Sequence, residues 1–474
     1  GVLMAGLDAR IVIIGMPEVI SALGADAEQG IWINQAYLLG SIAVMLLVGR
    51  LTDVWGRKRI YTGGFVIFTV GSVLTSLAGD PLQVVLFRII QGIGAGTILT
   101  NSVALITDAT PKKQLGFSLG VNNLGFRIGA MAGLTVSGMV LSLLGDWRAL
   151  FYLNVPIGIF GTLWAQFAIK ETLPDNGEKQ RLCMDWVGFA AFTTFVTSLL
   201  LMLTFAAYGI ASQLITLECI VICIASFAVF LFHERRCSSP LLDLKLFRIR
   251  EYTGGILAQL INAVAWGAVL LLLSFYFQLV LGLSPLEAGV RIIPFDIAFL
   301  VFGPLSGKLS DRFGHLPFTT AGIVLSSFSL FLFSTVDAAT PYATTAVYMV
   351  LFGAAIGLFS SPNMSAVMCS VPAERRGIGS ALRATFFNVG FAMSLNLAIL
   401  IMSFTVPYAL VTQVAAGYTT ALETEKTMFL QSLKTTYLWL AGLNALALIP
   451  SVLRGKGVFT KKSEEAQAEL DAMI

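Results

Sequence analysis

Long apolar runs, separated by short polar segments, follow one another along nearly the whole chain of 474 residues. Most runs are about 20 residues long, the length that an α-helix needs to cross the hydrocarbon core of a bilayer. Strands of a membrane β-barrel would instead alternate in segments of about ten residues. The pattern therefore predicts membrane-spanning helices. We place fourteen, at residues 1–22, 31–50, 59–78, 82–106, 115–143, 149–169, 185–207, 212–232, 252–281, 286–307, 317–336, 343–366, 377–405 and 430–453.

A short basic turn between the second and third spans returns in the second half of the chain. The segment 49–59 reads GRLTDVWGRKR, and the segment 307–315 reads GKLSDRFGH. A G-x-L-x-D-x-x-G frame recurs at a constant offset of 258 residues, whereas a generic positive loop would explain only the lysines and arginines. A repeat at equal positions between apolar runs indicates two related halves of a membrane protein.

Lysine and arginine are concentrated on one side of the predicted membrane. If the N-terminus lies in the cytoplasm, twenty-two of the thirty fall in cytoplasmic segments, five lie within spans, and three lie outside. The three outer residues are Arg148, Lys426 and Lys434. This bias is the positive-inside pattern and predicts that both termini are cytoplasmic in a multi-pass protein of the cell membrane.

Spans 185–207 and 212–232 stand between the related halves and account for the long repeat offset. We therefore predict six helices, two inserted helices and six further helices. The predicted parts are an N-terminal bundle (1–170), an insertion with flanking cytoplasmic loops (171–250), a C-terminal bundle (251–455) and a polar, mobile cytoplasmic tail (456–474).

Residues 406–429 are too many for a simple turn, so we expect an outward-facing hairpin or surface helix there. Because the chain begins inside an apolar run without methionine, we expect the native N-terminus further upstream and no cleavable signal peptide.

Composition supports a membrane protein and disfavours several other classes. The chain is 56% hydrophobic and 12% charged, with a mean hydropathy of +0.83, whereas soluble domains carry about 25% charged residues. A net charge of only +3 gives no support to a nucleic-acid partner. Cys219 and Cys223 are four residues apart but lack histidine or acidic company, so we expect neither a metal site nor a disulfide framework. The sequence contains no P-loop motif, so we do not expect ATP to drive the protein directly. His233 and His315 are the only histidines and both lie in predicted cytoplasmic loops, so we expect no hydrolytic triad and no enzymatic activity.

Five segments resemble signatures of the major facilitator superfamily. The basic turn is similar to the loop between helices 2 and 3, and its repeat to the matching loop of the second half. Residues 88–96 resemble the helix-4 signature R-x-x-Q-G-x-G-A, and residues 146–158 resemble the helix-6 entry W-R-x-x-F-x-x-N-x-P. Residues 7–12 with Pro17 resemble the helix-1 signature of the 14-helix drug:proton antiporter branch. The resemblance implies an all-α membrane protein with two six-helix bundles and two extra transmembrane helices, driven by a proton gradient without a cofactor.

Two departures from the branch weaken what the resemblance implies about transport direction. Arg10 stands where the branch usually has a small polar residue. The predicted fifth helix keeps a glycine ladder, at Gly125, Gly129 and Gly133, which we expect to allow close helix packing. Its usual proline is replaced by Ala130, however, and one of its paired glycines by Leu134. Without the proline, this antiporter signature supports export only weakly.

We single out eight ionisable residues within the predicted spans. They are Asp8, Arg10, Arg88, Arg127, Glu218, Arg291, Asp296 and Arg383. A charge at the centre of a membrane helix costs about 2.5–3.5 kcal/mol, so each should face a partner or a wet cavity. We expect Asp8 to pair with Arg88, because a carboxylate beside an arginine can gain a proton when that arginine moves away. The family resemblance implies the same coupling pair, and the alternative is an ion pair that only braces two helices.

The remaining intramembrane charges leave alternatives open. Asp296 is a candidate second protonation or substrate site, or else a partner of Arg291 or of a neighbouring helix. Glu218 lies outside the predicted core, and we expect a structural role. Of these eight residues, the core spans hold two acids and five arginines, and arginine cannot lose its proton. If the arginines do not all pair, their surplus favours neutral, zwitterionic or anionic amphiphiles.

The resemblance also implies a cytoplasmic latch that helps to hold an outward-open state. Its residues are Asp53, Arg57 and Arg59 in the first copy and Asp311 and Arg312 in the second. Our candidates for the substrate cavity are Arg10, Gln91, Arg127, Trp266, Tyr276, Arg383, Phe386 and Phe387. Each aromatic residue alone has the alternative role of packing against the protein or the lipid.

We therefore predict a monomeric, proton-coupled secondary transporter that exports an amphipathic small molecule by alternating access. Two alternatives stay open. The arginine surplus and the lost proline favour a proton-coupled importer or an anion exchanger. A membrane receptor of the same fold is the other alternative, although the presence of both Asp8 and Arg88 argues against it.

Overall fold

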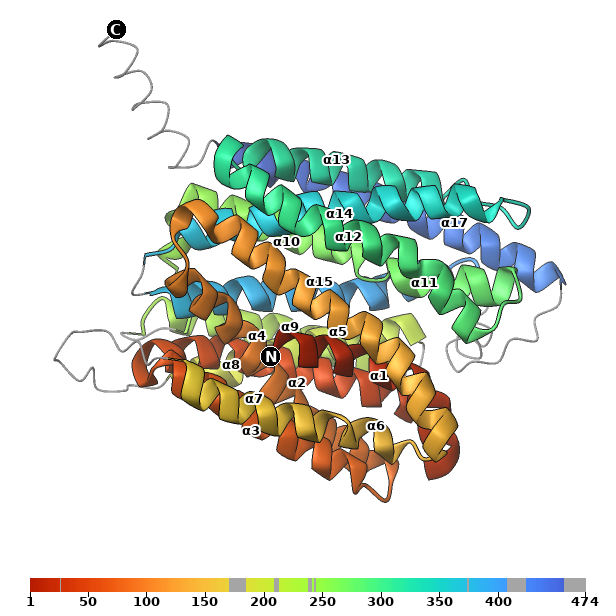
Figure 1. Ribbon diagram of the computed structural model, residues 1–474, viewed down its shortest axis with the longest axis horizontal. Helices are drawn as coiled ribbons and strands as arrows, with labels where there is room; N and C mark the ends of the chain where they lie inside the picture. Colours follow the sequence, from red (N-terminus) through yellow and green to blue (C-terminus); the bar gives the residue numbers. More distant parts are fainter. Residues whose placement is uncertain are drawn as a thin grey trace, which may run out of the picture.

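The computed structural model describes residues 1–25, 27–169, 185–208, 213–237, 241–242, 244–372, 375–406 and 423–455. These residues are predominantly helical and include no β-strand, which confirms the prediction of an all-α fold. The helices run side by side along the longest axis of the molecule (Figure 1). The expected hairpin within 406–429 and the expected mobile tail lie largely or entirely outside the described residues.

The first half of the chain folds into α1 (Val2–Leu23), α2 (Ala27–Trp55), α3 (Arg57–Ser76), α4 (Pro81–Ala109), η1 (Lys112–Gln114), α5 (Leu115–Leu144), α6 (Arg148–Tyr152) and α7 (Asn154–Ala168). The inserted pair is α8 (Trp186–Tyr208) and α9 (Gln213–Glu234). The second half comprises η2 (Leu246–Arg248), α10 (Arg250–Trp266), α11 (Val269–Phe275), the π-helical turn η3 (Tyr276–Val280), α12 (Pro285–Phe313), α13 (Leu316–Phe333), α14 (Tyr342–Ser370), α15 (Arg376–Ser403), α17 (Glu423–Leu446) and α18 (Leu448–Leu453).

Eleven spans within the described residues are long and apolar enough to cross a membrane. Helices α1, α3 and α5 overlap predicted spans but are not among the eleven, so the number fourteen stays a prediction. Three predicted spans are interrupted helices, and the last of them, residues 430–453, forms the end of α17 together with α18. Residues 149–169 form α6 and α7, and residues 252–281 form α10, α11 and η3.

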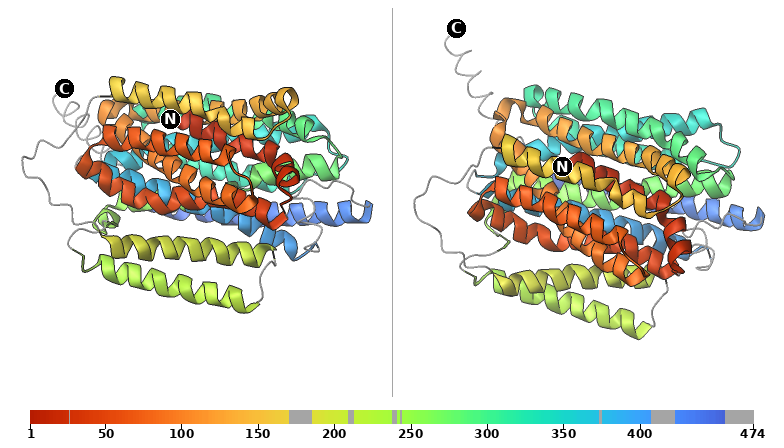
Figure 2. Two further views of the ribbon diagram at one scale, coloured as in Figure 1. Left: turned by 90° about the horizontal axis from the view of Figure 1, so that it is seen from below. Right: turned by 60° about the horizontal axis from the view of Figure 1, so that its bottom comes forward.

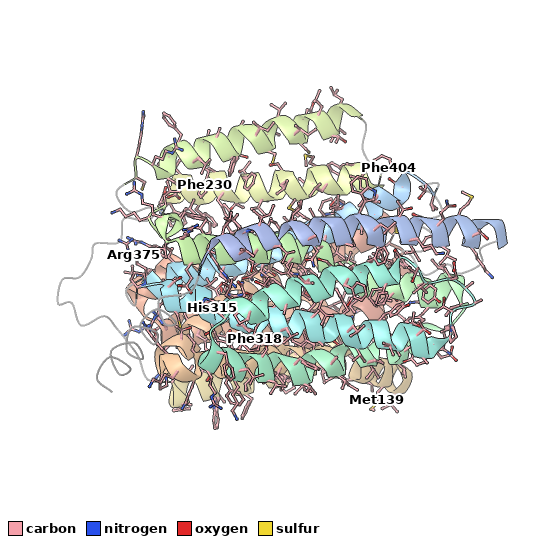
Figure 3. The ribbon with its side chains drawn as sticks, turned by 90° about the horizontal axis from the view of Figure 1, so that it is seen from above. Met139, Phe230, His315, Phe318, Arg375 and Phe404 are labelled. Carbon is pink, nitrogen blue, oxygen red and sulfur yellow. The ribbon has the colours of Figure 1, made fainter. Side chains whose placement is uncertain are left out.

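The repeated sequence frame ends in a tight turn at the same end of the molecule in both halves. Gly56, between α2 and α3, has φ 94°, and Gly314, between α12 and α13, has φ 81°. Glycine adopts such backbone angles without the strain that a Cβ would cause. Figure 3 shows His315 and Arg375 at this end, and Phe404 toward the other. We call the end that contains Gly56 and Gly314 the basic end.

The two halves repeat the same order of helix packing. Helix α2 packs on α4 as α12 packs on α14, α3 packs on α4 as α13 packs on α14, and α1 packs on α5 as α10 packs on α15. Helices α8 and α9 pack on each other, and α8 contacts α2 and α15. Figure 2 shows this pair as two yellow-green helices at one side of the bundle. This arrangement is the one expected for a duplicated core with two inserted helices, while the exact domain bounds stay a prediction.

The glycine ladder of α5 lies against α1. A Cβ placed on Gly129 would lie 2.0 Å from the Leu3 carbonyl oxygen, and one on Gly133 would lie 2.6 Å from the Leu7 oxygen. On Gly125 the nearest atom would be a Val2 methyl at 3.3 Å. Small residues therefore let the two backbones approach directly, as in other membrane helix pairs.

We expect Gly129→Ala to lower the free energy of unfolding by about 1–3 kcal/mol, because the added methyl group forces α1 and α5 apart. Gly63→Ala on α3 is the matched control, since a Cβ there would meet nothing within 4 Å. Alanine in a helix interior is intrinsically favoured over glycine by up to about 1 kcal/mol. Thermal unfolding of the two purified variants in detergent measures the difference. Equal midpoints would show that the contact between α1 and α5 is not tight.

Candidate functional site

Asp8 of α1 is fully buried in the first half and has three hydrogen-bond donors around its carboxylate. The Arg88 Nη1 lies 2.8 Å from Asp8 Oδ2. Gln91 Nε2 and Asn154 Nδ2 donate to Asp8 Oδ1 over 2.9 Å and 2.8 Å. Hydrogen bonds and a guanidinium at this range stabilise the charged form of a carboxylate. The predicted pair of Asp8 and Arg88 is thus present, and we call these four residues the Asp8 cluster.

Helix α4 supplies two of the donors because Arg88 and Gln91 are three residues apart and share one helix face. Arg88 Nη1 also donates to Gln91 Oε1 over 2.6 Å, and its guanidinium lies 4.3 Å from the centroid of the Tyr37 ring. Three buried atoms of the cluster and its wall have no hydrogen-bond partner within the described part of the chain: Arg88 Nε, Tyr37 Oη and Asn154 Oδ1. The cluster therefore retains spare hydrogen-bonding capacity.

A second buried ion pair joins the two halves of the protein. Arg127 Nη1 on α5 lies 3.3 Å from Asp296 Oδ1 on α12. Of the alternatives left open for Asp296, the partner is thus a neighbouring helix, contributed by the other half of the chain. Arg291 instead has its guanidinium 5.2 Å from the Tyr342 ring.

Aromatic rings surround the Arg127 guanidinium. Its carbon lies 4.3 Å from the Phe299 ring centroid and 5.2 Å from those of Trp266 and Phe295, which is the range of cation–π contacts. Arg10 lies close enough to interact electrostatically with both Asp296 and Arg127. With two arginines and one aspartate, this interhalf cluster has a formal charge of +1.

The structure brings together only part of the predicted substrate cavity. Trp266 packs on Phe387, with ring centroids 6.3 Å apart, so Phe387 adjoins the interhalf cluster. Phe386 packs on Phe247 instead, since successive helical residues point about 100° apart. Tyr276 lies elsewhere and donates its hydroxyl to the Asp337 carbonyl, and Gln91 belongs to the Asp8 cluster.

Arg383 on α15 is buried, one helical turn before Phe387. Its Nε has no hydrogen-bond partner, and no carboxylate of the described residues forms an ion pair with it. A buried positive charge without a counter-ion is energetically costly.

At the basic end, each half caps a helix of the other half. Asp53 at the end of α2 accepts the N–H groups of Gly377 and Ile378 in the first turn of α15, both over 3.0 Å. Asp311 at the end of α12 accepts the N–H groups of Gly116 and Phe117 in the first turn of α5, over 3.0 Å and 3.1 Å. Carboxylates at helix N-termini satisfy free N–H groups and complement the helix dipole. The two copies of the sequence frame thus make equivalent contacts, each capping a helix of the other half.

Ion pairs reinforce the first of these caps. Arg57 pairs with Asp108 at the end of α4 and lies 3.7 Å from Asp53. Arg376 Nη1 of α15 lies 2.9 Å from Asp108 Oδ1. Asp108 and Arg376 were not among the residues selected from the sequence, because they fall just beyond the ends of the predicted spans.

The other two latch candidates lie at the surface of the basic end. Arg59 and Arg312 both have exposed side chains, and the Arg312 guanidinium lies 5.8 Å from the ring of its neighbour Phe313. The functional roles of the five latch candidates remain predictions, and the geometry favours Asp53, Arg57 and Asp311.

Comparison with known proteins identifies the family. The model of the Major Facilitator Superfamily matches residues 1–395. The chain belongs to the major facilitator superfamily. Members of this superfamily are multi-pass membrane transporters and not enzymes, so this transporter acts on a small molecule that it moves rather than converts.

Its relatives include transporters of different compounds. The transporter is 30% identical over 394 residues to the riboflavin transporter RibZ of Clostridioides difficile (strain 630), covering 83% of this chain and 84% of that protein. It is 27% identical over 390 residues to the tetracenomycin C resistance and export protein of Streptomyces glaucescens, covering 82% and 72%. It is 29% identical over 400 residues to the multidrug resistance protein Stp of Mycobacterium tuberculosis (strain CDC 1551 / Oshkosh), covering 83% and 73%.

Solved structures of the superfamily share the fold of this transporter. The proton:xylose symporter XylE superimposes with a TM-score of 0.64 at 17% identity, covering 95% of this chain and 92% of that one. The human organic anion transporter MFSD10 superimposes with a TM-score of 0.63 at 12% identity, covering 95% and 98%. At these identities the likeness concerns the fold alone.

We expect the double variant Asp53→Ala/Asp311→Ala to open the basic end of this transporter. Each lost helix cap costs about 0.5–2 kcal/mol, and both losses fall on the closed state. Spin labels on cysteines at the exposed positions Phe167 and Phe313, in a background without native cysteines, report the separation of the halves. We expect a new population at longer distance. Asp146→Ala, an exposed acid that takes no part in the interhalf caps, is the control, and identical distributions in all three proteins would contradict the capping role.

Proposed function

We propose that this transporter is a proton-coupled antiporter that exports amphipathic organic compounds by alternating access. The observation that carries the proposal is Asp8, a fully buried carboxylate that forms an ion pair with an arginine from another helix. Relatives named for drug resistance and for export of tetracenomycin C support the direction. The proton gradient supplies the energy, and the transporter acts as a monomer.

The Asp8 cluster offers two states that differ by one proton. In one state Arg88, Gln91 and Asn154 donate to the Asp8 carboxylate. If α1 moves away from α4, Asp8 loses these three donors, and the carboxylate becomes accessible to the coupled proton. A neutral carboxyl group needs an acceptor for its proton, and the unpartnered Asn154 Oδ1 can provide one after a small rotation.

Helix α1 connects this proton site with the interhalf cluster. Asp8 and Arg10 are two residues apart, so their side chains point about 200° apart on the helix. Asp8 contacts α4 in the first half, whereas Arg10 interacts with Asp296 of α12. A substrate that displaces Arg10 or Arg127 from Asp296 therefore acts on the helix that carries the proton site.

The interhalf caps support alternating access. The positive-inside pattern predicts that the basic end faces the cytoplasm, so the described conformation is closed on that side. The caps at Asp53 and Asp311 must break before the cytoplasmic side opens. Rocking of two related halves about a midplane site is the usual mechanism for such duplicated folds.

A second candidate is an importer or exchanger of anionic or zwitterionic solutes. The observation that favours it is Arg383, which has no acidic partner within the described residues and lies one helical turn from Phe387. The same arginine is compatible with export of an amphiphile that has a negative or strongly polar group. Direction and substrate charge therefore need separate readouts.

The experiment uses the purified transporter in liposomes that enclose a pH-sensitive dye, with equal pH on both sides. Cationic, neutral, zwitterionic and anionic amphiphiles, riboflavin among them, are added outside. Antiport exchanges the entering substrate for leaving protons, so the interior becomes alkaline. Interior acidification would instead indicate symport and overturn the proposal, and substrate exchange without a pH change would indicate an anion exchanger.

Arg383→Gln tests the charge class in the same assay. We expect it to weaken transport of negatively charged substrates about tenfold, the equivalent of one charge-assisted hydrogen bond, and to leave uncharged substrates unaffected. Arg148→Gln is the matched control because Arg148 is half-exposed and pairs with Asp146 away from both clusters. An equal response of all substrates to Arg383→Gln would remove the assignment of Arg383 to substrate binding.

A further inference from the structure

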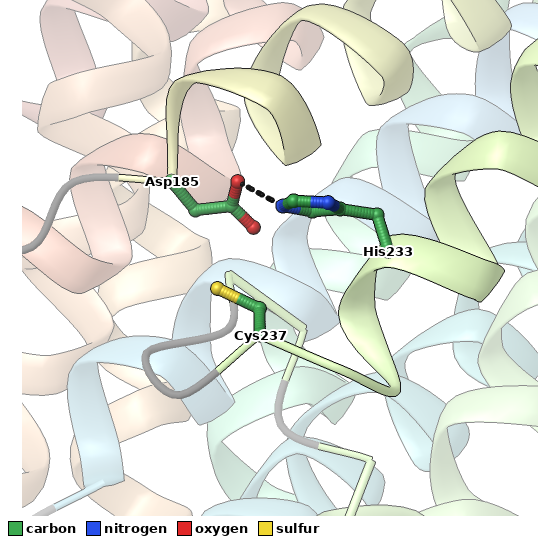
Figure 4. Close-up of side chains that lie close together, drawn as sticks. All are labelled: Asp185, His233 and Cys237. Atoms are coloured by element: carbon green, nitrogen blue, oxygen red, sulfur yellow. Dashed lines mark hydrogen bonds and ion pairs between the residues drawn. The ribbon is translucent and has the colours of Figure 1, made fainter.

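Asp185, His233 and Cys237 meet at the basic end of the inserted helices α8 and α9 (Figure 4). One potential metal ligand atom from each residue lies within 4.8 Å of those of the other two. Asp185 directly precedes α8, His233 lies in the last turn of α9, and Cys237 follows the turn after α9. The Cys237 N–H donates to the His233 carbonyl over 2.9 Å, which folds the thiol back beneath the imidazole.

Asp185 and Glu234 are buried carboxylates beside His233, and each has one oxygen that accepts a hydrogen bond and one oxygen without a partner among the described residues. Asp185 Oδ1 accepts the Gly188 N–H over 2.7 Å and lies 2.7 Å from His233 Nε2, while its Oδ2 has no hydrogen-bond partner among the described residues. Glu234 Oε1 accepts the Leu241 N–H over 3.2 Å, and its Oε2 likewise has none. Residue exposures are only 6% for Asp185 and 3% for Glu234.

The two carboxylates converge on one space. A Cβ on Gly188 would lie 2.3 Å from Asp185 Oδ2 and 3.0 Å from Glu234 Oε1, so a side chain there would occupy the region between them. The nearby arginines point elsewhere: Arg235 is exposed, and the Arg236 guanidinium lies 4.2 Å from the Phe232 ring. Two buried carboxylates beside a single imidazole leave negative charge that is costly to bury. A divalent cation would balance it.

We propose that Asp185, His233 and Cys237 bind a zinc ion, with Glu234 as the fourth ligand. A set of one nitrogen, one sulfur and two carboxylate oxygens fits Zn²⁺, whereas Mg²⁺ and Ca²⁺ prefer oxygen alone. Zinc–ligand bonds of about 2.0–2.3 Å require the donor atoms of Asp185, His233 and Cys237 to approach one another from within 4.8 Å to about 3.3–3.8 Å, and Glu234, which is not part of that group of three, must turn toward them. Side-chain rotation on zinc binding breaks the hydrogen bond between Asp185 and His233. The thiol releases its proton on binding.

The bound ion joins the start of α8 to the end of α9 and to the segment that leads toward α10, where Leu241 and Leu242 are buried. Its role is to fix the inserted pair against the core. The sequence predicted no metal site, because Asp185 lies 48 residues before His233 and only the fold brings them together. The site shares no residue with the Asp8 or interhalf clusters, so it does not depend on the proposed function.

The test uses the purified full-length transporter, stripped of metal with a chelator and then titrated with Zn²⁺ against a chromogenic zinc chelator. We expect one ion per chain, confirmed by elemental analysis after gel filtration, and a rise in the thermal unfolding midpoint with Zn²⁺. His233→Ala and Cys237→Ser should weaken binding at least tenfold. Cys219→Ser on α9 is the matched control and should bind as the wild type does.

Cobalt binding to the wild type gives a readout that does not depend on the folding of a variant. Co²⁺ bound through a thiolate produces a charge-transfer absorption in the near ultraviolet, which we expect in the wild type and in Cys219→Ser but not in Cys237→Ser. Fewer than one high-affinity zinc ion per chain would overturn the proposal. So would zinc binding that is unchanged in Cys237→Ser, or a wild-type cobalt complex without thiolate absorption.

Discussion

Replacing Asp8 by asparagine is expected to reduce substrate-driven proton movement in liposomes to the level of protein-free vesicles. Asparagine has nearly the size of aspartate but cannot carry a proton. In the wild type the carboxylate is fully buried and accepts hydrogen bonds from Arg88, Gln91 and Asn154 over 2.8–2.9 Å. Asp8 is the one acid among these four residues, so the variant cluster has no carboxylate to carry the proton. The dye assay in liposomes measures the loss.

A second variant separates lost coupling from lost folding. Asp8→Asn alone leaves the Arg88 charge buried and uncompensated, which costs about 3–5 kcal/mol of stability. In Asp8→Asn/Arg88→Gln both charges are absent, so we expect thermal stability to recover in part while proton movement stays absent. If Asp8→Asn retains gradient-dependent transport, then the ion pair only braces α1 against α4 and coupling must reside elsewhere.

Asp296→Asn is expected to destabilise the transporter far more than Arg127→Gln. Asp296 is the only acid that interacts with both Arg10 and Arg127 in the interhalf cluster among the described residues. Its removal leaves two buried positive charges, at a cost of about 3–5 kcal/mol. Removal of Arg127 leaves Asp296 with Arg10, a neutral pair, so we expect a loss of about 1–3 kcal/mol.

Thermal unfolding of the two variants in detergent provides the comparison. The double variant Asp296→Asn/Arg127→Gln should be more stable than Asp296→Asn alone, because it has one uncompensated charge fewer. Equal losses in the two single variants would show that Arg10 does not contribute to the cluster. Because the pair joins α5 to α12, we also expect both single variants to change the balance between the closed and open states.

The sequence determined the class and the approximate layout of this protein. The length and polarity of the apolar runs predict membrane helices because a bilayer requires about 20 apolar residues per span. The repeated G-x-L-x-D-x-x-G frame predicts two related halves, since Gly56 and Gly314 must both allow the same tight turn. The pair of Asp8 and Arg88 was also predictable, because a buried charge in a membrane requires a partner and the family signatures contain both residues.

Only the tertiary structure decided which partner each remaining charge has. Asp296 and Arg127 lie 169 residues apart in the chain, and no local pattern indicates that α5 lies beside α12. Asn154 reaches Asp8 because α7 packs near α1, and Asp53 meets the start of α15 because the halves close on each other. Phe386 packs on Phe247 whereas Phe387 packs on Trp266, because successive residues of a helix point in different directions. Asp185, His233 and Cys237 lie on three segments that only the packing of α8 on α9 brings together. Sequence fixes helix length and polarity locally, whereas side-chain partners depend on how helices are placed and rotated against one another.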